Sequence, residues 1–148
     1  MKDNMKVVLV DADESFRMML RQMIEAAGDF EVAGSVGNGA EAWRIIAREC
    51  PQLVVMDVIL PELDGFGLLD RLASMAARPR AILVSAFCQG QMVKRAMKQG
   101  AEAFIPKPCE MEELLGQMHR AAQRAEEENA RDAALERLCV RRPELTRS

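Results

Sequence analysis

Short apolar runs alternate along the chain with longer stretches in which apolar residues recur at helical spacing. The runs are uninterrupted, as in Val7 to Val10 and Leu53 to Met56, which is typical of strands that are covered on both faces. The stretches between them end at Gly or Pro, such as Gly28, Pro51 and Gly100. The pattern therefore predicts five strands, at 7–10, 30–36, 53–56, 81–84 and 103–105, each followed by a helix, at 16–27, 42–47, 68–76, 92–97 and from 110 onward.

This alternation of strands and helices predicts an α/β fold built on one parallel sheet. Parallel neighbours need long crossover connections, and right-handed crossovers place the helices on both faces of the sheet. We therefore expect a doubly wound sheet. Such a sheet binds its ligand beyond the carboxyl ends of its strands, so the residues that follow each strand are the first candidates for function.

Composition narrows the classes of function. The 148 residues suffice for one domain with a short appendage, and 49% apolar and 29% charged residues are ordinary for a globular protein. The net charge of −3 provides no basic field for nucleic acid or membrane, and the apolar runs are too short to span a membrane. The four cysteines form no C-x-x-C pair and His119 is the only histidine, which disfavours a zinc site and predicts reduced cysteines in the cytoplasm.

The apolar pattern weakens after about residue 124, which divides the chain into two parts. We assign residues 1–123 to the folded domain and residues 124–148 to a helical extension or a linker-like tail. Glu126 to Glu128 is a charge run that favours a solvated helix face over a binding patch, whereas Leu135 and Leu138 would allow the last helix to continue. A partner-binding extension is the alternative.

Acids, a hydroxyl and an amine follow the predicted strands. Asp11 and Asp13 follow the first strand, Asp57 the third, Ser85 the fourth and Lys107 the fifth. Asp and Ser are common where a strand leads into a helix, because their side chains cap helices. The carboxyl ends of parallel strands meet at one edge of the sheet, so we expect these five side chains to converge there.

Such a set of side chains suits phosphoryl transfer to a carboxylate. An aspartate can act as the nucleophile and form an aspartyl phosphate. A divalent cation such as Mg²⁺ can bridge the anionic phosphoryl group and the acidic cluster through oxygen ligands. A lysine ammonium and a serine hydroxyl can hold further phosphoryl oxygens. The sequence has no Gly-rich phosphate loop, so nucleotide binding is not indicated.

Four motifs resemble those of response-regulator receiver domains from two-component signalling systems. They are an acidic strand end, a phosphoacceptor segment with Pro and Gly after its aspartate, a hydroxyl switch motif and a lysine–proline motif: Leu9-Val-Asp-Ala-Asp-Glu14, Met56-Asp-Val-Ile-Leu-Pro-Glu-Leu-Asp-Gly65, Val84-Ser-Ala86 and Ile105-Pro-Lys-Pro108. The resemblance covers roughly residues 6–122. Within the family, segments 85–89 and 104–115 are most similar to receivers of regulators that control sporulation.

The resemblance implies a flavodoxin-like fold with strand order 2-1-3-4-5 and a role for several residues. Asp57 would be the phosphoacceptor. Ser85 and Lys107 would contact the phosphoryl group, and Phe104 would be the aromatic side chain that changes rotamer on activation. The chain would thus be a phosphoacceptor signalling domain and not an enzyme, with self-catalysed phosphotransfer and slow autodephosphorylation at most.

The resemblance also implies a Mg²⁺ site and a set of structural residues. The metal would be held by Asp11, Asp57 and the backbone carbonyl of Ile59, with Asp13 as a further candidate. The structural residues would be Pro61, Gly65 and Pro108, the last preceded by a cis peptide bond.

The partners that the resemblance implies are a sensor histidine kinase or a phosphotransfer protein. A homodimer through the surface of the fourth helix, fifth strand and fifth helix is a further candidate. We expect no membrane association and no direct binding of nucleic acid by this chain. A DNA-binding output domain, and with it transcription regulation, would require a longer native protein.

One position departs from the family pattern. The family has two adjacent acids after the first strand, and the second acid contacts the metal, whereas this chain has Ala12 at that position. The departure weakens the predicted Mg²⁺ site and supports an alternative function, a pseudo-receiver that serves as an interaction module with impaired phosphorylation. A flavin-binding protein on a related sheet is disfavoured, because acids at the first strand end would repel a phosphate.

Overall fold

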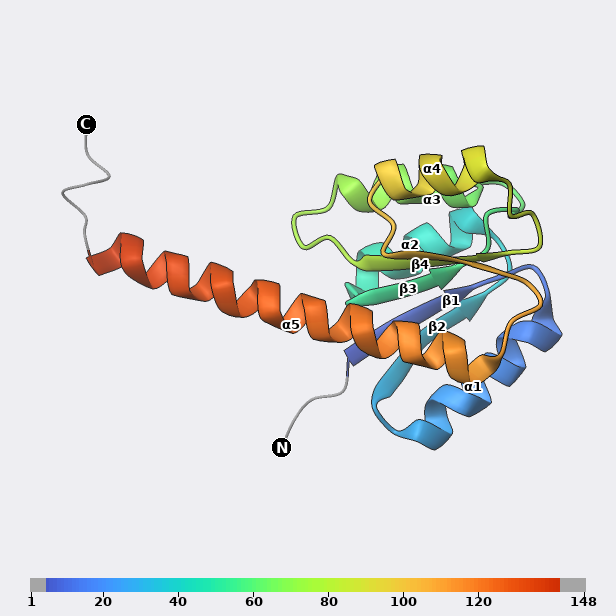
Figure 1. Cartoon of the computed structure of the whole chain (residues 1–148), viewed down its shortest axis with the longest axis horizontal. Helices are drawn as coiled ribbons and strands as arrows, with labels where there is room; N and C mark the ends of the chain where they lie inside the picture. Colours follow the sequence, from blue (N-terminus) through green and yellow to red (C-terminus); the bar gives the residue numbers. More distant parts are fainter. Residues whose placement is uncertain (1–4, 142–148) are drawn as a thin grey trace.

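The computed structural model describes residues 5–141 and shows a single parallel sheet with helices on both sides (Figure 1). The strand order is β2-β1-β3-β4-β5, which confirms the predicted α/β, flavodoxin-like fold. The elements are β1 (Met5–Val10), α1 (Glu14–Ala27), β2 (Phe30–Val36), α2 (Gly39–Glu49), β3 (Leu53–Met56), α3 (Gly65–Ala73), β4 (Arg80–Ser85), α4 (Gly90–Lys98), β5 (Ala103–Pro106) and α5 (Met111–Arg141).

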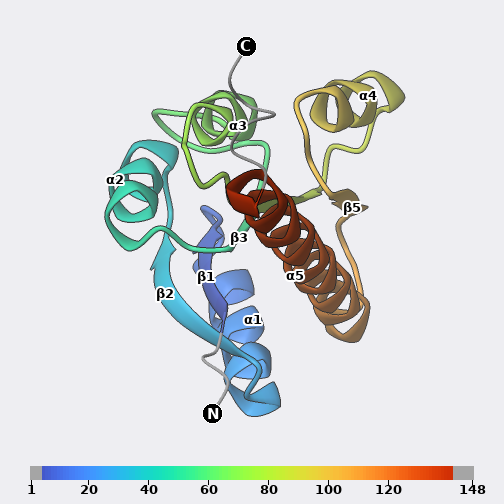
Figure 2. The same ribbon diagram turned by 90° about the vertical axis from the view of Figure 1, so that its left-hand side faces the viewer.

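The sheet separates two hydrophobic cores. Helices α1 and α5 cover one face, and α2, α3 and α4 cover the other (Figure 2). Successive strand residues point to opposite faces, so Val7 and Leu9 enter the core beneath α1 and α5, while Val8 and Val10 enter the other. Burial on both faces explains why β1, β3 and β4 contain continuous apolar runs, at 7–10, 53–56 and 81–84, and not alternating patterns.

Capping residues determine where the helices begin and end, which the spacing of apolar residues predicted only approximately. Helix α3 begins at Gly65 and not at residue 68, because the side chain of Asp64 accepts a hydrogen bond from the N–H of Gly67 (2.8 Å). Helix α1 ends at Gly28, as predicted, where a φ of 78° gives the left-handed conformation that glycine readily adopts. The ends of β2 and β3 agree with the prediction.

Helix α5 has 31 residues and extends well beyond the sheet (Figure 1). It continues through the charge run at 126–128 and ends at Arg141. Within residues 5–141, no helix combines the length and the apolar character that crossing a membrane requires. Residues 142–148 of the predicted tail lie outside the described residues.

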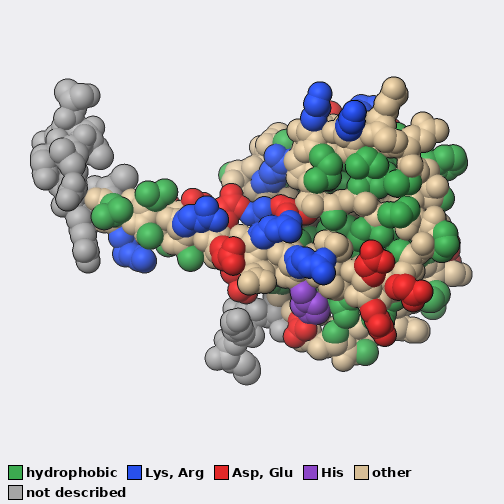
Figure 3. Space-filling model, viewed as in Figure 1, with side chains coloured by type: hydrophobic (Ala, Val, Ile, Leu, Met, Phe, Trp, Pro, Cys, Tyr) green, Lys and Arg blue, Asp and Glu red, His purple; other side chains and the backbone are tan. Residues whose placement is uncertain are grey.

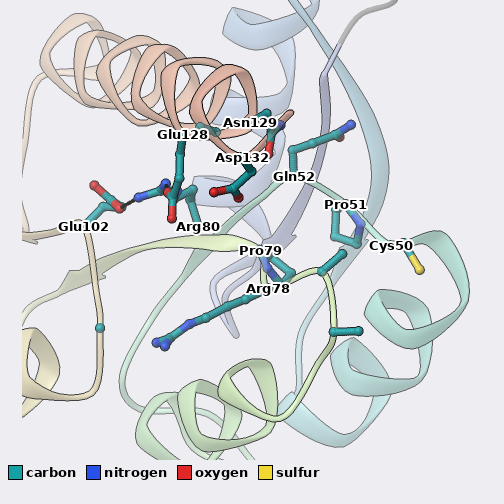
Figure 4. Close-up of a pocket in the computed structure, with 14 residues that line it drawn as sticks. Cys50, Pro51, Gln52, Arg78, Pro79, Arg80, Glu102, Glu128, Asn129 and Asp132 are labelled. Carbon is teal, nitrogen blue, oxygen red and sulfur yellow. Dashed lines mark hydrogen bonds and ion pairs between the residues drawn. The ribbon is translucent and has the colours of Figure 1, made fainter. Parts of the chain in front are cut away.

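An ion-pair network connects α5, at residues 124–128, to the edge of the sheet where the strands begin (Figure 4). Glu102, just before β5, contacts Arg80 of β4 and also Arg124 of α5 (2.6 Å), and Arg80 contacts Glu128 as well. Burial raises the pKa of Glu102, but the hydrogen bonds and charges of the two arginines outweigh burial and hold this pKa below its ordinary value. The network therefore ties α5 to two strands.

A polar cleft of about 540 Å³ opens beside this network (Figure 4). Its walls are α5 and the loops that lead into β3, β4 and β5. The cleft thus lies at the amino ends of the strands, whereas a doubly wound sheet carries its functional site at the carboxyl ends. The residues that the sequence selected lie at the carboxyl edge, so we assign no function to the cleft.

Replacing Glu102 with Gln should lower the free energy of unfolding by about 1 kcal/mol at neutral pH, because both arginines lose a charged partner. The folded-state pKa of Glu102 is lowered, so its stabilisation is complete above the unfolded-state pKa of about 4.3 and is lost as the pH falls through the folded-state value. Urea unfolding of both proteins at several pH values measures this. Glu127→Gln, which changes an exposed carboxylate of α5, is the control. An equal loss in both variants at neutral pH would contradict the role of the network.

Candidate functional site

The register of the central strands brings two aspartates side by side. Val10 of β1 pairs with Met56 of β3, and the next residues are Asp11 and Asp57. Main-chain hydrogen bonds between the strands continue for one residue beyond the strand ends. The N–H of Asp57 donates to the carbonyl of Val10 (2.9 Å), and the N–H of Asp11 donates to the carbonyl of Val36 (3.1 Å). The sheet itself therefore fixes the backbones of both acids.

Lys107 reaches these acids from beyond the end of β5. Its N–H donates to the carbonyl of Ser85 (2.9 Å), and its peptide bond to Pro108 is cis. The ammonium Nζ lies 2.6 Å from Asp11 Oδ2 and 3.3 Å from Asp57 Oδ2. The structure thus brings together three of the residues that the strand-end pattern selected, although they come from three different strands.

Burial and charge oppose each other in this group. Asp11 is only 4% exposed, and burial raises its pKa above the ordinary value despite hydrogen bonds from Lys107 and the N–H of Asp13. Burial also lowers the pKa of Lys107, but Asp11 and Asp57 outweigh it and raise this pKa above its ordinary value. Lys107 is therefore an ammonium at neutral pH, and it places a positive charge beside the carboxyl group of Asp57.

The loop after β3 folds tightly over Asp57 and leaves no room for a side chain at Gly65. The N–H of Gly65 donates to the carbonyl of Val58 (2.8 Å), and a Cβ at Gly65 would lie 2.7 Å from the carbonyl oxygen of Asp57. In the same loop, the N–H of Ile59 donates to Asp57 Oδ1 (3.2 Å), and the carbonyl of Pro61 accepts from the N–H of Gly39 (3.2 Å). The loop thus orients the Asp57 carboxylate.

Ser85 and Phe104 lie on neighbouring strands, and neither side chain forms a hydrogen bond or ion pair with the acid–lysine group, although the backbone carbonyl of Ser85 accepts from the N–H of Lys107. Ser85 is the last residue of β4 and is fully buried, and its Oγ accepts a hydrogen bond from the N–H of Phe87 (3.2 Å). Phe104 of β5 is half-buried and packs against the core beneath α2, α3 and α4. Their phosphoryl-contacting and switching roles remain predictions.

Asp13 caps helix α1 and does not turn toward Asp57. Its Oδ1 accepts a hydrogen bond from the N–H of Phe16 (3.2 Å), and its own N–H donates to Asp11 Oδ1 (2.9 Å). Ala12, between the two acids, is exposed. No group of three or more acidic, His or Cys side chains within the described part of the chain is placed to hold a metal. The pair Asp11 and Asp57 still fits Mg²⁺, which commonly takes one or two carboxylates and completes its shell with water.

Two site residues were not selected from the sequence. Phe16, interpreted only as a core residue of its helix, lies with its ring centroid 4.3 Å from Lys107 Nζ. Arg17 donates from Nη1 to the carbonyl of Asp11 and from Nε to Ser35 Oγ (3.2 Å), so it links α1 to the ends of β1 and β2. The sequence offers no direct signal for either contact, because both depend on where α1 crosses the sheet edge.

Comparison with known proteins identifies the family. Residues 7–119 match the family model described as the response regulator receiver domain. The chain belongs to the response-regulator receiver domain family. The matched segment contains all of the predicted site residues, so the receiver fold, the strand-end acids and the lysine after β5 belong to one recognised domain.

Receiver domains of several bacteria are similar to this chain. It is 36% identical to the chemotaxis protein CheY of Bacillus subtilis over 110 residues, which are 74% of this chain and 91% of that protein. The response regulator domain of Thermotoga maritima CheB is 28% identical, with a TM-score of 0.74 over 80% of this chain and 96% of that one. A CheX–CheY–BeF3–Mg²⁺ complex from Borrelia burgdorferi matches with 25% identity and a TM-score of 0.69, covering 77% and 86% of the two chains.

Replacing Gly65 with Ala should destabilise the receiver domain by about 1–3 kcal/mol, because the new methyl group would displace the backbone of Asp57 and Val58. Gly116→Ala in α5 is the control. A methyl group there meets no atom within 4 Å and should stabilise the helix by about 0.5–1 kcal/mol. Denaturant unfolding gives both values. A neutral effect at Gly65 would show that the loop after β3 is not held as tightly as its contacts indicate.

Proposed function

We propose that this receiver domain accepts a phosphoryl group on Asp57 and changes conformation in response. The observation that carries the proposal is the placement of the Asp57 carboxylate, with Lys107 Nζ at 3.3 Å from one oxygen and the N–H of Ile59 at 3.2 Å from the other. Both donors would remain available to stabilise charge when a phosphoryl group is attached to Asp57. The donor would be a sensor histidine kinase or a phosphotransfer protein, and the reaction would be self-catalysed on the receiver side.

Mg²⁺ is the proposed cofactor of the transfer. Asp11, Asp57 and the backbone carbonyl of Ile59 would hold it, and Asp13 is a weaker candidate because its Oδ1 caps α1. When bound, the cation would neutralise the phosphoryl oxygens. The protein residues would align Asp57 through the β1–β3 register and keep the Lys107 ammonium beside it. The complex of the Borrelia burgdorferi relative contains BeF3 and Mg²⁺, which supports both the proposed phosphoryl site and the proposed cofactor.

Ser85 and Phe104 are the proposed relay from the phosphoryl group to the surface of α4, β5 and α5. β4 and β5 are paired strands, with Ser85 opposite Pro106 and Leu83 opposite Phe104. A shift of Ser85 toward a phosphoryl oxygen would therefore act directly on β5. A charge at one edge of the sheet can shift the balance between two conformations only if the two conformations contact that charge differently. Phe104 is the residue that we propose to move between them.

The surface of α4, β5 and α5 is the proposed site of homodimerisation. Figure 3 shows hydrophobic side chains gathered on the face between α4 and α5, with Lys and Arg side chains along its upper border. Helix α4 contributes Lys94, Arg95 and Lys98 as its charged residues.

Further parts of the proposal are the domain boundary at residue 123 and transcription control through a longer protein. We also propose a cytoplasmic location, and the free thiols of Cys50, Cys88 and Cys109 support this location.

A pseudo-receiver is the second candidate function, and Ala12 is the observation that favours it. With Ala12 exposed and Asp13 engaged in a helix cap, two carboxylates and not three face the expected metal position. A pseudo-receiver would keep the fold and its interaction surfaces but would not accept phosphoryl efficiently. Incubation with acetyl phosphate and Mg²⁺ separates the two candidates.

Asp57→Asn should abolish phosphorylation by acetyl phosphate, because an amide cannot act as the nucleophile. Intact-mass measurement of the parent and the variant after incubation with Mg²⁺ checks this. Asp64→Asn is a suitable control, since Asn also caps helices and should leave labelling intact. Undiminished labelling of Asp57→Asn would contradict the assignment of the phosphoacceptor, and no labelling of the parent would favour the pseudo-receiver.

The same samples test the relay and the dimer. Beryllofluoride should shift amide resonances between Val93 and Leu115 and increase the sedimentation coefficient of the parent but not of Asp57→Asn. Unmoved resonances in that segment would exclude the relay, and an unchanged sedimentation coefficient would exclude activation-dependent dimerisation through this surface.

Ala12→Asp should bind Mg²⁺ about 10-fold more tightly than the parent, or better, because a carboxylate oxygen and its charge are restored. Calorimetric titration measures the affinities. Ala12→Asn supplies the oxygen without the charge, and Asp13→Ser removes the carboxylate of residue 13 while keeping a capping side chain. If Ala12→Asp binds no better while Asp13→Ser binds much worse, Asp13 is the surrogate ligand and the site is not weakened.

A further inference from the structure

We propose that the ring of Phe16 positions the Lys107 ammonium beside the Asp11–Asp57 carboxylate pair, which makes Phe16 a positioning residue of the phosphoacceptor site. Because Lys107 acts on a phosphoryl group only if Asp57 receives one, this proposal rests on the function proposed above. It adds a residue from α1 to a site whose other members lie at the ends of strands.

The ammonium of Lys107 makes two ion pairs and one contact with an aromatic ring. The ion pairs are with carboxylate oxygens, of Asp11 at 2.6 Å and of Asp57 at 3.3 Å, and the ring is that of Phe16, whose centroid lies 4.3 Å from Nζ. A cation within about 6 Å of a ring centroid is attracted by the negative face of the ring. This attraction grows when water is excluded, and the Lys107 side chain is only 17% exposed.

Backbone hydrogen bonds fix the ring relative to the acids. The N–H of Phe16 donates to Asp13 Oδ1 (3.2 Å), and the N–H of Asp13 donates to Asp11 Oδ1 (2.9 Å). Asp11 Oδ2 then meets Lys107 Nζ, which lies over the Phe16 ring. These contacts form a closed circuit through four residues, so the cap of α1 determines where the ring holds the ammonium.

A ring at this place differs from a carboxylate in its effect on the site. Lysine has a long and flexible stem, so a third contact beside the two carboxylates further restricts where its ammonium lies. A third carboxylate would restrain it but would add negative charge where the anionic phosphoryl group must enter. The Phe16 ring restrains the ammonium without adding net charge, and the neighbouring Ala12 is likewise uncharged.

Ordinary packing is the competing explanation for Phe16. The side chain is half-buried and contacts the core beneath α1 and α5. A packing role needs only an apolar side chain, which leucine supplies, whereas the proposed role needs a π face, which tyrosine supplies. Phe16→Leu and Phe16→Tyr therefore separate the two explanations, and Met19→Leu, an exposed apolar exchange on the same helix, is the control.

The first measurement uses the full chain without any ligand. NMR signals of the Lys107 ε-methylene group, assigned by their absence in Lys107→Met, should be shifted upfield in the parent by the ring current of Phe16. They should return toward the values of exposed lysines in Phe16→Leu and stay upfield in Phe16→Tyr and Met19→Leu. Lys107 signals that are the same in Phe16→Leu and in the parent would overturn the proposal, whatever the site does with phosphoryl groups.

The second measurement is the affinity for beryllofluoride in the presence of Mg²⁺. Phe16→Leu should bind about 2- to 30-fold more weakly than the parent, the range that corresponds to one cation–π contact, and Phe16→Tyr should bind like the parent. Equal affinities of Phe16→Leu and the parent would overturn the positioning role even if the Lys107 signals move, and a loss shared by Phe16→Tyr would assign Phe16 to packing. If the parent binds no beryllofluoride, the proposed function fails, while the Lys107 signals still decide whether Phe16 holds the ammonium.

Discussion

The structure depends on the placement of two carboxylates beside a single ammonium at the edge of an apolar sheet. Asp11 is buried, and burial raises its pKa, so a cation in contact favours the charged form of this carboxyl group. Lys107 supplies that cation at 2.6 Å and 3.3 Å. The parallel register fixes the backbones of both acids, the loop that closes at Gly65 orients Asp57, and the N–H of Asp13 at the cap of α1 holds Asp11.

The fold and the centre of the site were predictable because they follow from short-range rules. Buried parallel strands are apolar runs, and their carboxyl ends meet, so Asp11, Asp57 and Lys107 could be grouped from their positions alone. The contact of Phe16 with Lys107 could not, since helical spacing shows which face of α1 is apolar but not what lies opposite one ring. The continuation of α5 was left open for a similar reason, because Arg80 and Glu128, which hold it, are far apart in the sequence.

Ala12 shows that a chain can belong to the receiver family and still lack one acid that the motif at its first strand end was expected to supply. The chain matches the receiver family over residues 7–119, yet Ala12 carries a methyl group at a position where the resemblance of the motifs implied an acid. Asp13 does not simply take over, because its carboxylate and its N–H join Phe16 to Asp11. The site therefore combines fewer acids with a closely held lysine, a different balance of charge for the same proposed reaction.

The anchored α5 helix also gives the domain the geometry of a lever. A helix rises by about 1.5 Å per residue, so its 31 residues form a rod on the order of 45 Å long. The ion pairs of Arg80 and Glu102 hold α5 at the end of the sheet that lies opposite to Asp57. The part of α5 beyond Arg124 is on the order of 25 Å long, so a tilt of about 5° about these ion pairs would displace the far end by roughly 2 Å. A small tilt of α5 about these ion pairs would thus produce its largest displacement at the distal end of the helix.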